Sequence, residues 1–295
     1  MPPPLLALVA IAIWGSLALL STLTLGLPSL FTTGVALCIG GLAGLGRVRE
    51  WRVPWKTFAV GLGGIFGYHA LLFSALAIAP AIEVSLLNYL WPLLIVLLSP
   101  LVLPGLRLSW RHVLGAVMGL AGAVLIASGG QAALDGAFLP GYLMAIAAAF
   151  VWALYSLMTK RLPPFPTGAV GGFCLASGLL SLLLFLIEGG ANFVLPRPSV
   201  EQWLALLALG LGPMGLAFYA WDAALKKGDP RVIGSLAYLT PLLATFNLVV
   251  VGGRKLASPA LVALVLIVGG AVLSSTGGRG STGGRARSAA GVIKG

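Results

Sequence analysis

Aromatic, amide and imidazole side chains stand inside long apolar stretches of this sequence. Tyr68 and His69 are adjacent, and Asn88, Tyr89 and Trp91 lie together in the next stretch. Indole and phenol rings offer flat faces for stacking, while an amide or a neutral imidazole offers a few directed hydrogen bonds. Such groups are suited to binding an amphipathic small molecule. A membrane-embedded enzyme would instead need a cluster of His, Asp or Glu at one membrane face, and the apolar stretches contain none.

Similar residues recur in the second half of the chain at matched spacing. Trp14 corresponds to Trp152, 138 positions later, and Tyr89 corresponds to Tyr238, 149 positions later. Residues on one face of each helix can thus contribute to a shared wall. The candidate substrate-binding residues are Trp14, Tyr68, His69, Asn88, Tyr89, Trp91, Trp152, Tyr155 and Tyr238.

Each of these residue types also has a structural role that the sequence leaves open. Trp14 and Trp152 could serve core packing, because large aromatic residues dominate cores. Tyr89 and Tyr238 could be interfacial anchors, although they lie too deep in their stretches for that role. His69 could bind a carboxylate or amine, could titrate and couple transport to protons, or could be satisfied by a neighbouring hydroxyl.

Two prolines occupy equivalent mid-stretch positions and are the candidate hinges. Pro92 and Pro241 each remove a backbone donor and free the carbonyl four residues earlier, at Asn88 and Ala237. In hydrocarbon a free carbonyl is costly unless it lines a cavity or meets a polar partner. The pattern favours kinked, cavity-lining helices, with a kink repaired by neighbouring side chains as the alternative.

The elements that must position these residues are membrane helices. The 295 residues are 59% hydrophobic and 8% charged, with a mean hydropathy of +1.05. This composition excludes an ordinary soluble domain, and continuous apolar runs exclude an outer-membrane barrel. The sequence predicts ten helical spans, at residues 5–24, 30–46, 57–78, 83–103, 113–130, 139–158, 168–187, 202–224, 232–251 and 259–276.

The basic residues predict the orientation of these spans. With a cytoplasmic N-terminus, 15 of the 18 Lys and Arg residues fall in inner loops or the tail, and only Arg197, Arg254 and Lys255 fall outside. This positive-inside bias places both termini in the cytoplasm. The net charge of +11 therefore reports topology rather than a nucleic-acid partner. Residues 277–295, rich in Gly, Ser and Arg, read as a disordered basic tail near anionic lipid.

Internal repetition divides the chain into two similar halves. The run Tyr89–Leu94 matches Tyr238–Leu243, and Gly122–Leu125 matches Gly270–Leu273. Residues 1–130 and 131–276 then hold five spans each, and because five is odd the second half enters the membrane inverted. The fold class is an all-α polytopic membrane protein with two inverted five-helix repeats. Such repeats are characteristic of secondary transporters that alternate access to a midplane site.

These features resemble a known family. Small-residue packing in the third helix of each half, a Tyr-Leu-x-Pro-Leu-Leu run in the fourth and Gly-Ala-Val-Leu in the fifth resemble the EamA-type branch of the drug/metabolite transporter superfamily. The likeness covers residues 5–276. Within that branch, the aromatic crowding is most similar to that of bacterial aromatic amino acid exporters. The resemblance implies export as the direction of transport.

The sequence therefore predicts a bacterial inner-membrane transporter, not an enzyme, that exports aromatic amino acids or similar amphipathic metabolites by alternating access. A deep cation or carboxylate is absent from the spans, which favours a neutral or zwitterionic substrate with a large apolar part. No cofactor or metal is expected, since Cys38 and Cys174 lack metal-ligand spacing. The expected partners are the substrate and the lipid bilayer. The sequence does not determine the oligomeric state and is compatible with a monomer. The alternatives are broad efflux of flat aromatic toxic compounds, a lipid-modifying membrane enzyme and an assembly protein.

Overall fold

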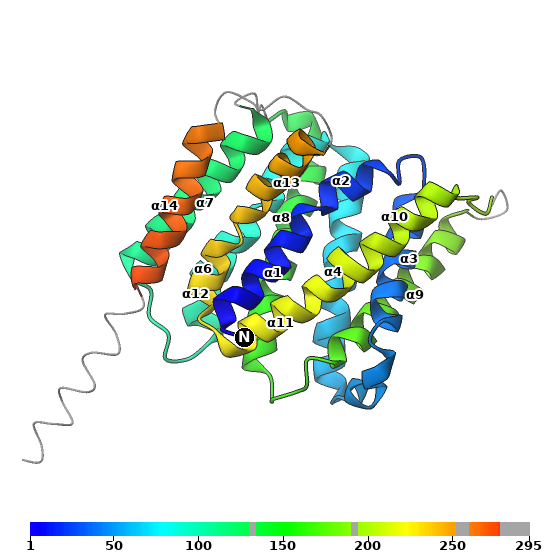
Figure 1. Cartoon of the computed structure of the whole chain (residues 1–295), viewed down its shortest axis with the longest axis horizontal. Coiled ribbons are helices and arrows are strands. Elements are labelled where there is room, and N and C mark those ends of the chain that lie inside the picture. The colour runs from blue at the N-terminus through cyan, green and yellow to red at the C-terminus, as the bar shows by residue number, and fades with distance from the viewer. Residues whose placement is uncertain (130–133, 190–193, 252–259, 278–295) are drawn as a thin grey trace, which may run out of the picture.

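A bundle of helices forms the protein in the computed structural model (Figure 1). The structure describes residues 1–129, 134–189, 194–251 and 260–277, and within these it contains helices and no strand. The elements are α1 (Pro3–Gly15), α2 (Leu17–Thr22), α3 (Ser29–Leu42), η1 (Leu45–Trp51), α4 (Trp55–Ile78), α5 (Ala81–Asn88), α6 (Leu90–Val102), α7 (Trp110–Ser128), η2 (Gly136–Phe138), α8 (Leu139–Arg161), α9 (Ala169–Gly189), α10 (Val200–Leu211), η4 (Gly212–Leu216), α11 (Ala217–Lys227), α12 (Pro230–Leu236), α13 (Leu239–Val250) and α14 (Ala260–Gly277).

Eight helices of the described residues are long and apolar enough to cross a membrane. The number rises to nine if α3 and η1, which are bent by 88° at their break, count as one span. The helix of the expected span 30–46 is thus shorter, because the chain turns at Ala43 and Gly44, and the charged residues Arg47 and Arg49 follow in η1. The segment of the expected ninth span holds α12 and α13, which are not among the eight. The protein is therefore a multi-pass helical membrane protein.

Both proline-containing segments are broken rather than gently kinked. α5 ends at Asn88 and α6 begins at Leu90, whereas α12 ends at Leu236 and α13 begins at Leu239. Each proline consequently lies at the third position of a new helix, where a backbone N–H has no intrahelical acceptor. The breaks lie beside Asn88 and Ala237, the residues whose carbonyl groups the prolines were expected to free, and each proline fits the first turn of a new helix more easily than a helix interior.

Helix packing follows a pattern of matched pairs. α4 packs against α8 as α11 packs against α1, and α6 packs against α8 as α13 packs against α1. α3 packs against α9, and α7 against α14. The last pair approaches closely at Gly115 and Gly270, where a Cβ on either residue would collide with the carbonyl oxygen of the other. Small residues allow this contact between backbones, as is usual for helices in lipid.

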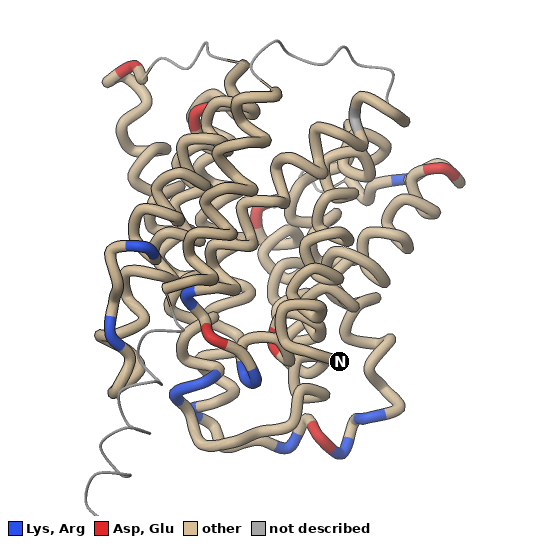
Figure 2. Tube along the Cα trace, turned by 60° about the vertical axis from the view of Figure 1, so that its left-hand side comes forward, with Lys and Arg blue, Asp and Glu red and all other residues tan. Residues whose placement is uncertain are grey.

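Charged residues are distributed unevenly along the bundle. Figure 2 shows most Lys and Arg positions gathered toward the end of the bundle where the N-terminus lies. Arg197, which precedes α10, lies at the opposite end, because α11 returns the chain to the N-terminal end at Lys227. Arg254, Lys255 and the tail 278–295 lie outside the described residues.

Candidate functional site

A cavity of about 370 Å³ lies among the helices. Residues of α1 and α2, α4, α5, α6, α8, η4, α11 and α13 line it, so both halves of the chain contribute. Ser21 near the end of α2, Leu76 near the end of α4 and Ser85 in the middle of α5 are among the lining residues. The cavity therefore extends toward the end of the bundle opposite the N-terminus. Its volume lies in the range of small-molecule sites.

Aromatic rings packed edge to face form one end of this cavity. The ring centroids of Trp14 and Trp152 are 5.9 Å apart with an interplanar angle of 72°, and those of Trp14 and Trp91 are 6.2 Å apart at 81°. Phe218 lies 5.4 Å from Trp152, and Tyr68 lies 5.1 Å from it. Such geometry is favourable for aromatic pairs. These rings therefore serve packing and cavity lining at once.

The polar groups of the cavity are largely bonded to the protein itself. The Nδ1 atom of His69 lies 2.7 Å from the carbonyl oxygen of Ile65, and because a carbonyl only accepts, Nδ1 carries the proton. Nε2 of the uncharged ring is then an acceptor. Asn88 Nδ2 donates to Tyr68 Oη at 3.1 Å, and Trp14 Nε1 donates to Pro213 O at 3.0 Å. His69 is thus satisfied on one side by its own helix rather than by a neighbouring hydroxyl.

Seven of the nine predicted binding residues line the cavity. They are Trp14, Tyr68, His69, Asn88, Tyr89, Trp91 and Trp152. Tyr155 is not among the lining residues, since its ring packs against Trp152 and fills the space above Gly64 on α4. Tyr238 also lies away from the cavity, fully buried, where its hydroxyl accepts a hydrogen bond from the Leu93 backbone N–H at 3.1 Å. Tyr238 therefore supports the first turn of α6.

The sequence interpretation missed several lining residues. Phe218 of α11 and Thr240 of α13 line the cavity, as do Pro213 and Met214 of the π-helical turn η4. A signal for Thr240 was present, since it lies 149 positions after Trp91 and the repeat register therefore marks it. The π turn left no comparable signal, because a run of Gly-Pro-Met-Gly fits several backbone conformations.

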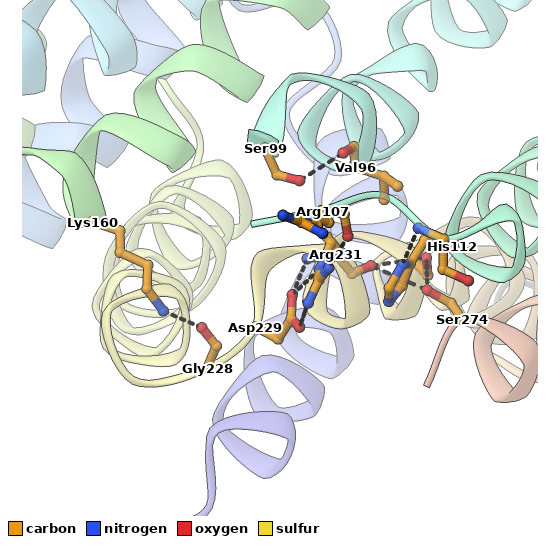
Figure 3. Close-up of polar contacts among 11 residues, drawn as sticks. Val96, Ser99, Arg107, His112, Lys160, Gly228, Asp229, Arg231 and Ser274 are labelled. Carbon is orange, nitrogen blue, oxygen red and sulfur yellow. Dashed lines mark hydrogen bonds and ion pairs between the residues drawn. The ribbon is translucent and has the colours of Figure 1, made fainter. Parts of the chain in front are cut away.

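A polar cluster lies around the start of α12 (Figure 3). Arg231, only 5% exposed, forms an ion pair with Asp229 and donates to the carbonyl oxygen of Arg107. Lys160 at the end of α8 donates to the carbonyl oxygen of Gly228. These contacts join the α6–α7 connection and α8 to the turn between α11 and α12.

The acid of this cluster is held in its charged form. Burial alone would raise the pKa of the Asp229 carboxyl, but the hydrogen bonds and charge of Arg231 outweigh it and hold the pKa below its ordinary value. Asp229 also caps α12 by accepting from the Arg231 backbone N–H at 2.9 Å. The cluster therefore ties the start of α12 to the α6–α7 connection at the N-terminal end of the bundle.

The lining determines what this site can do. Within the described residues, the cavity lining includes no Asp, Glu, Lys or Arg. No group of three His, Cys, Asp or Glu side chains that could hold a metal ion occurs among them either. A neutral, aromatic cavity inside a multi-pass helical bundle is suited to binding and passing an amphipathic molecule. Fold and site together define a membrane transporter for small molecules.

Comparison with known proteins identifies the family. Residues 1–128 and residues 139–276 each match the EamA-like transporter family. The chain belongs to this family. A solved crystal structure that is 42% identical in sequence superposes with a TM-score of 0.85, covering 93% of this chain and 97% of that chain.

Curated relatives include several amino-acid exporters. An aromatic amino acid exporter of Ancylobacter novellus is 43% identical over 280 residues, which cover 92% of this chain and 96% of the relative. An aromatic amino acid exporter of Salmonella typhimurium is 26% identical, covering 82% and 85%. A probable terminal-alkyne amino-acid exporter of Streptantibioticus cattleyicolor is 30% identical, covering 75% and 72%.

Proposed function

We propose that this protein exports aromatic amino acids, or amphipathic metabolites of similar shape, through the described cavity. The observation that carries the proposal is the cavity itself, whose wall combines aromatic rings from both halves of the chain with a neutral lining. The exporter of Ancylobacter novellus, 43% identical along nearly its whole length, supports the same substrate class. The match to a transporter family supports transport, and not enzymatic catalysis, as the proposed role.

In this proposal the substrate ring lies against the aromatic wall. Stacking on Trp14, Trp91, Trp152 or Tyr89 contributes about 0.5–1.5 kcal/mol beyond simple burial for each good contact. Asn88, His69 and Tyr68 meet the polar head group of the substrate. Tyr155 and Tyr238 act from behind the wall, Tyr155 by supporting Trp152 and Tyr238 by supporting the start of α6.

The architecture we propose is ten spans in two inverted five-helix repeats, residues 1–130 and 131–276. Its ninth crossing is α12 together with α13, broken at Tyr238 as α5 and α6 are broken at the equivalent Tyr89. The matched helix pairs support a two-fold relation, and the two separate family matches support a duplication. A further parallel is that Ile65 O and Pro213 O, 148 positions apart, both accept from a ring N–H of a cavity residue.

We further propose that the protein lies in a bacterial inner membrane with both termini in the cytoplasm. The gathering of Lys and Arg at the N-terminal end of the bundle supports this orientation (Figure 2). The cavity then opens outward, while the aromatic rings and the polar cluster of Figure 3 close the cytoplasmic side. Alternating access requires the opposite arrangement as well, with hinges at the two helix breaks beside Pro92 and Pro241.

Broad efflux of flat aromatic compounds is a second candidate. It is favoured by one observation, namely that no charged side chain of the described residues lines the cavity to read an amino-acid head group.

Counterflow in proteoliposomes separates the two candidates. Vesicles preloaded with unlabelled phenylalanine should accumulate labelled phenylalanine and tryptophan, with leucine accumulating about fivefold less per lost aromatic contact. A flat organic cation such as ethidium serves as the comparison. Accumulation of ethidium without phenylalanine would establish the second candidate and refute amino-acid export.

A further inference from the structure

The cavity carries more free hydrogen-bond acceptors than its composition suggests. Asn88 is only 8% exposed, and among the described residues its Oδ1 atom has no hydrogen-bond partner. The Oγ1 atom of Thr240, which also lines the cavity, is likewise buried without a partner. A buried acceptor without a donor costs free energy. A ligand that supplies polar hydrogens to these oxygens therefore recovers this cost.

Several hydrogen-bond donors of the cavity are used within the protein. The hydroxyl groups of Ser21 and Ser85 donate to carbonyl oxygens of their own helices, at Leu17 and Ala81. The N–H groups of Trp14 and His69 and the amide N–H of Asn88 donate to Pro213 O, Ile65 O and Tyr68 Oη. His69 Nε2 is consequently a third free acceptor in the uncharged ring. The donors that remain belong to neutral hydroxyl and indole groups.

The charges around the cavity also favour an ammonium group over a carboxylate. No Lys or Arg of the described chain lines the cavity, so a carboxylate buried there would lack a cationic partner. The faces of Trp14, Trp152 and Phe218, in contrast, attract a cation through their quadrupoles. An ammonium group therefore has both acceptors and aromatic faces available, whereas a carboxylate keeps better partners in water at the cavity mouth.

We propose that the cavity recognises an aromatic ring joined to a primary ammonium group and does not require the carboxylate. Aromatic amines and carboxyl-blocked aromatic amino acids are then ligands of this protein alongside the amino acids. The proposal rests on the proposed function, because it assigns the ammonium end of an exported amino acid to Asn88, Thr240 and His69. Its specific content is that the carboxylate contributes little affinity.

Four ligands that share a phenyl ring and a short alkyl chain test this preference. Binding to the purified full-length protein is measured by isothermal titration calorimetry for phenylalanine, phenylalaninamide, phenethylamine and 3-phenylpropionate. We expect Kd values of the amide and the amine within about threefold of that of phenylalanine, and a Kd of 3-phenylpropionate at least about tenfold higher. Equal or tighter binding of 3-phenylpropionate than of phenethylamine would overturn the proposal.

A pair of near-isosteric variants tests whether the ammonium group of the ligand binds at Thr240. Thr240→Val removes a hydroxyl that makes no internal hydrogen bond, so the fold loses none, and it should raise the Kd of phenylalanine and phenethylamine by the same factor of about three to ten. The matched control is Thr33→Val on α3, since Thr33 Oγ1 is also buried without a partner but lies outside the cavity lining. Equal effects of both substitutions on the Kd would show that the ammonium group does not bind at Thr240 and would contradict the assignment.

Failure of this inference and failure of the proposed function give different results. If phenylalanine is transported in proteoliposomes and binds while phenethylamine and phenylalaninamide do not, the ammonium preference is wrong and export stands. If phenethylamine binds but phenylalanine is not transported, the ammonium preference stands and amino-acid export is wrong. If none of the four ligands binds, both are wrong.

Discussion

At the scale of single residues, Tyr89 offers the cleanest test of aromatic recognition. Trp152 is 3% exposed and contacts five other aromatic rings, so its loss would damage packing as well as binding. Tyr89 is half-buried at the break between α5 and α6 and lines the cavity. We expect Tyr89→Leu to lower transport of phenylalanine relative to leucine about fivefold, because one stacking contact of about 1 kcal/mol is lost.

The matched control for this variant is Tyr142→Leu. Tyr142 is a buried tyrosine of α8 in a separate apolar cluster, outside the cavity lining. The control should leave the ratio of phenylalanine to leucine counterflow unchanged. An equal loss of phenylalanine and leucine transport in Tyr89→Leu would show that the residue serves folding alone.

His69 gives a second test at this scale. Its Nδ1 proton is donated to the Ile65 carbonyl oxygen within the same helix, an arrangement that anchors the ring rather than exposing it for proton exchange. We expect phenylalanine counterflow to proceed without an imposed pH gradient and to change less than about threefold in His69→Gln. Strict dependence on a proton gradient that disappears in this variant would make His69 the coupling residue.

The residue scale also shows where sequence patterns succeed. Helical spacing and the repeat correctly placed seven of the predicted binding residues around one cavity, because polar aromatic faces are poor lipid surfaces and turn inward. Tyr155 and Tyr238 share faces with the wall but meet a neighbouring helix instead, at Gly64 and at the start of α6. Spacing determines which residues share a face, whereas the partner of that face depends on tertiary packing.

At the scale of elements, the two prolines determine where helices begin. Pro92→Ala and Pro241→Ala each restore an N–H that can bond to the carbonyl oxygen four residues earlier and join the two short helices into one. We expect each variant to slow counterflow about threefold or more while the Kd of phenylalanine stays within about twofold, since the break is proposed to act as a hinge. Pro100→Ala, in the interior of α6 and away from the break, is the control. Unchanged counterflow in both variants would assign the breaks to structure only.

The polar cluster near the N-terminal end is a second element with a testable role. Asp229→Asn keeps a capping oxygen for α12 but leaves the buried Arg231 without its ionic partner. We expect this substitution to destabilise the described conformation by about 2 kcal/mol at pH 7. A lower midpoint of thermal unfolding of the purified protein would report the loss, with Glu201→Gln in the first turn of α10 as a control.

The pH dependence of this effect has a definite sign. Because the pKa of Asp229 is lower in the folded protein than its ordinary value near 3.9, its contribution is complete above that ordinary value. The contribution is lost as the pH falls through the folded-state pKa. The difference in midpoint between the original protein and Asp229→Asn should therefore be full at pH 7 and shrink below about pH 4. A difference that grew in acid would contradict the assigned ion pair.

Element boundaries were predictable where composition changes sharply. The start of α10 at Val200 and the end of α4 at Ile78 lie within two residues of the expected ends, because proline and charge delimit the apolar runs. The break at Tyr238 and the π turn at Gly212–Leu216 were not predicted at their positions. Both depend on contacts from other helices, such as the Tyr238 hydroxyl at Leu93 and the Trp14 indole at Pro213.

At the scale of the whole molecule, the account makes one cavity the path of the substrate. Multi-pass helical architecture followed from composition, whereas the contacts at the N-terminal end of the bundle did not. They depend on the side chains of Lys160 and Arg231, which reach the backbone carbonyl oxygens of Gly228 and Arg107 only in the folded chain. A conformation with the cavity open at one end and closed at the other is one half of an alternating cycle. The substrate must then pass the aromatic wall on every turnover.

Blocking the cavity at one residue tests this central claim most directly. Ala18 lines the cavity on α2, and Ala18→Cys in a background without Cys38 and Cys174 places a single thiol there. After reaction with a bulky, membrane-impermeant thiol reagent, we expect phenylalanine counterflow to be abolished, and we expect phenylalanine to slow the reaction at least about fivefold more than leucine does. Leu195→Cys, exposed in the connection before α10, should react without any effect on transport. Full counterflow by a completely modified Ala18→Cys protein would contradict transport through this cavity.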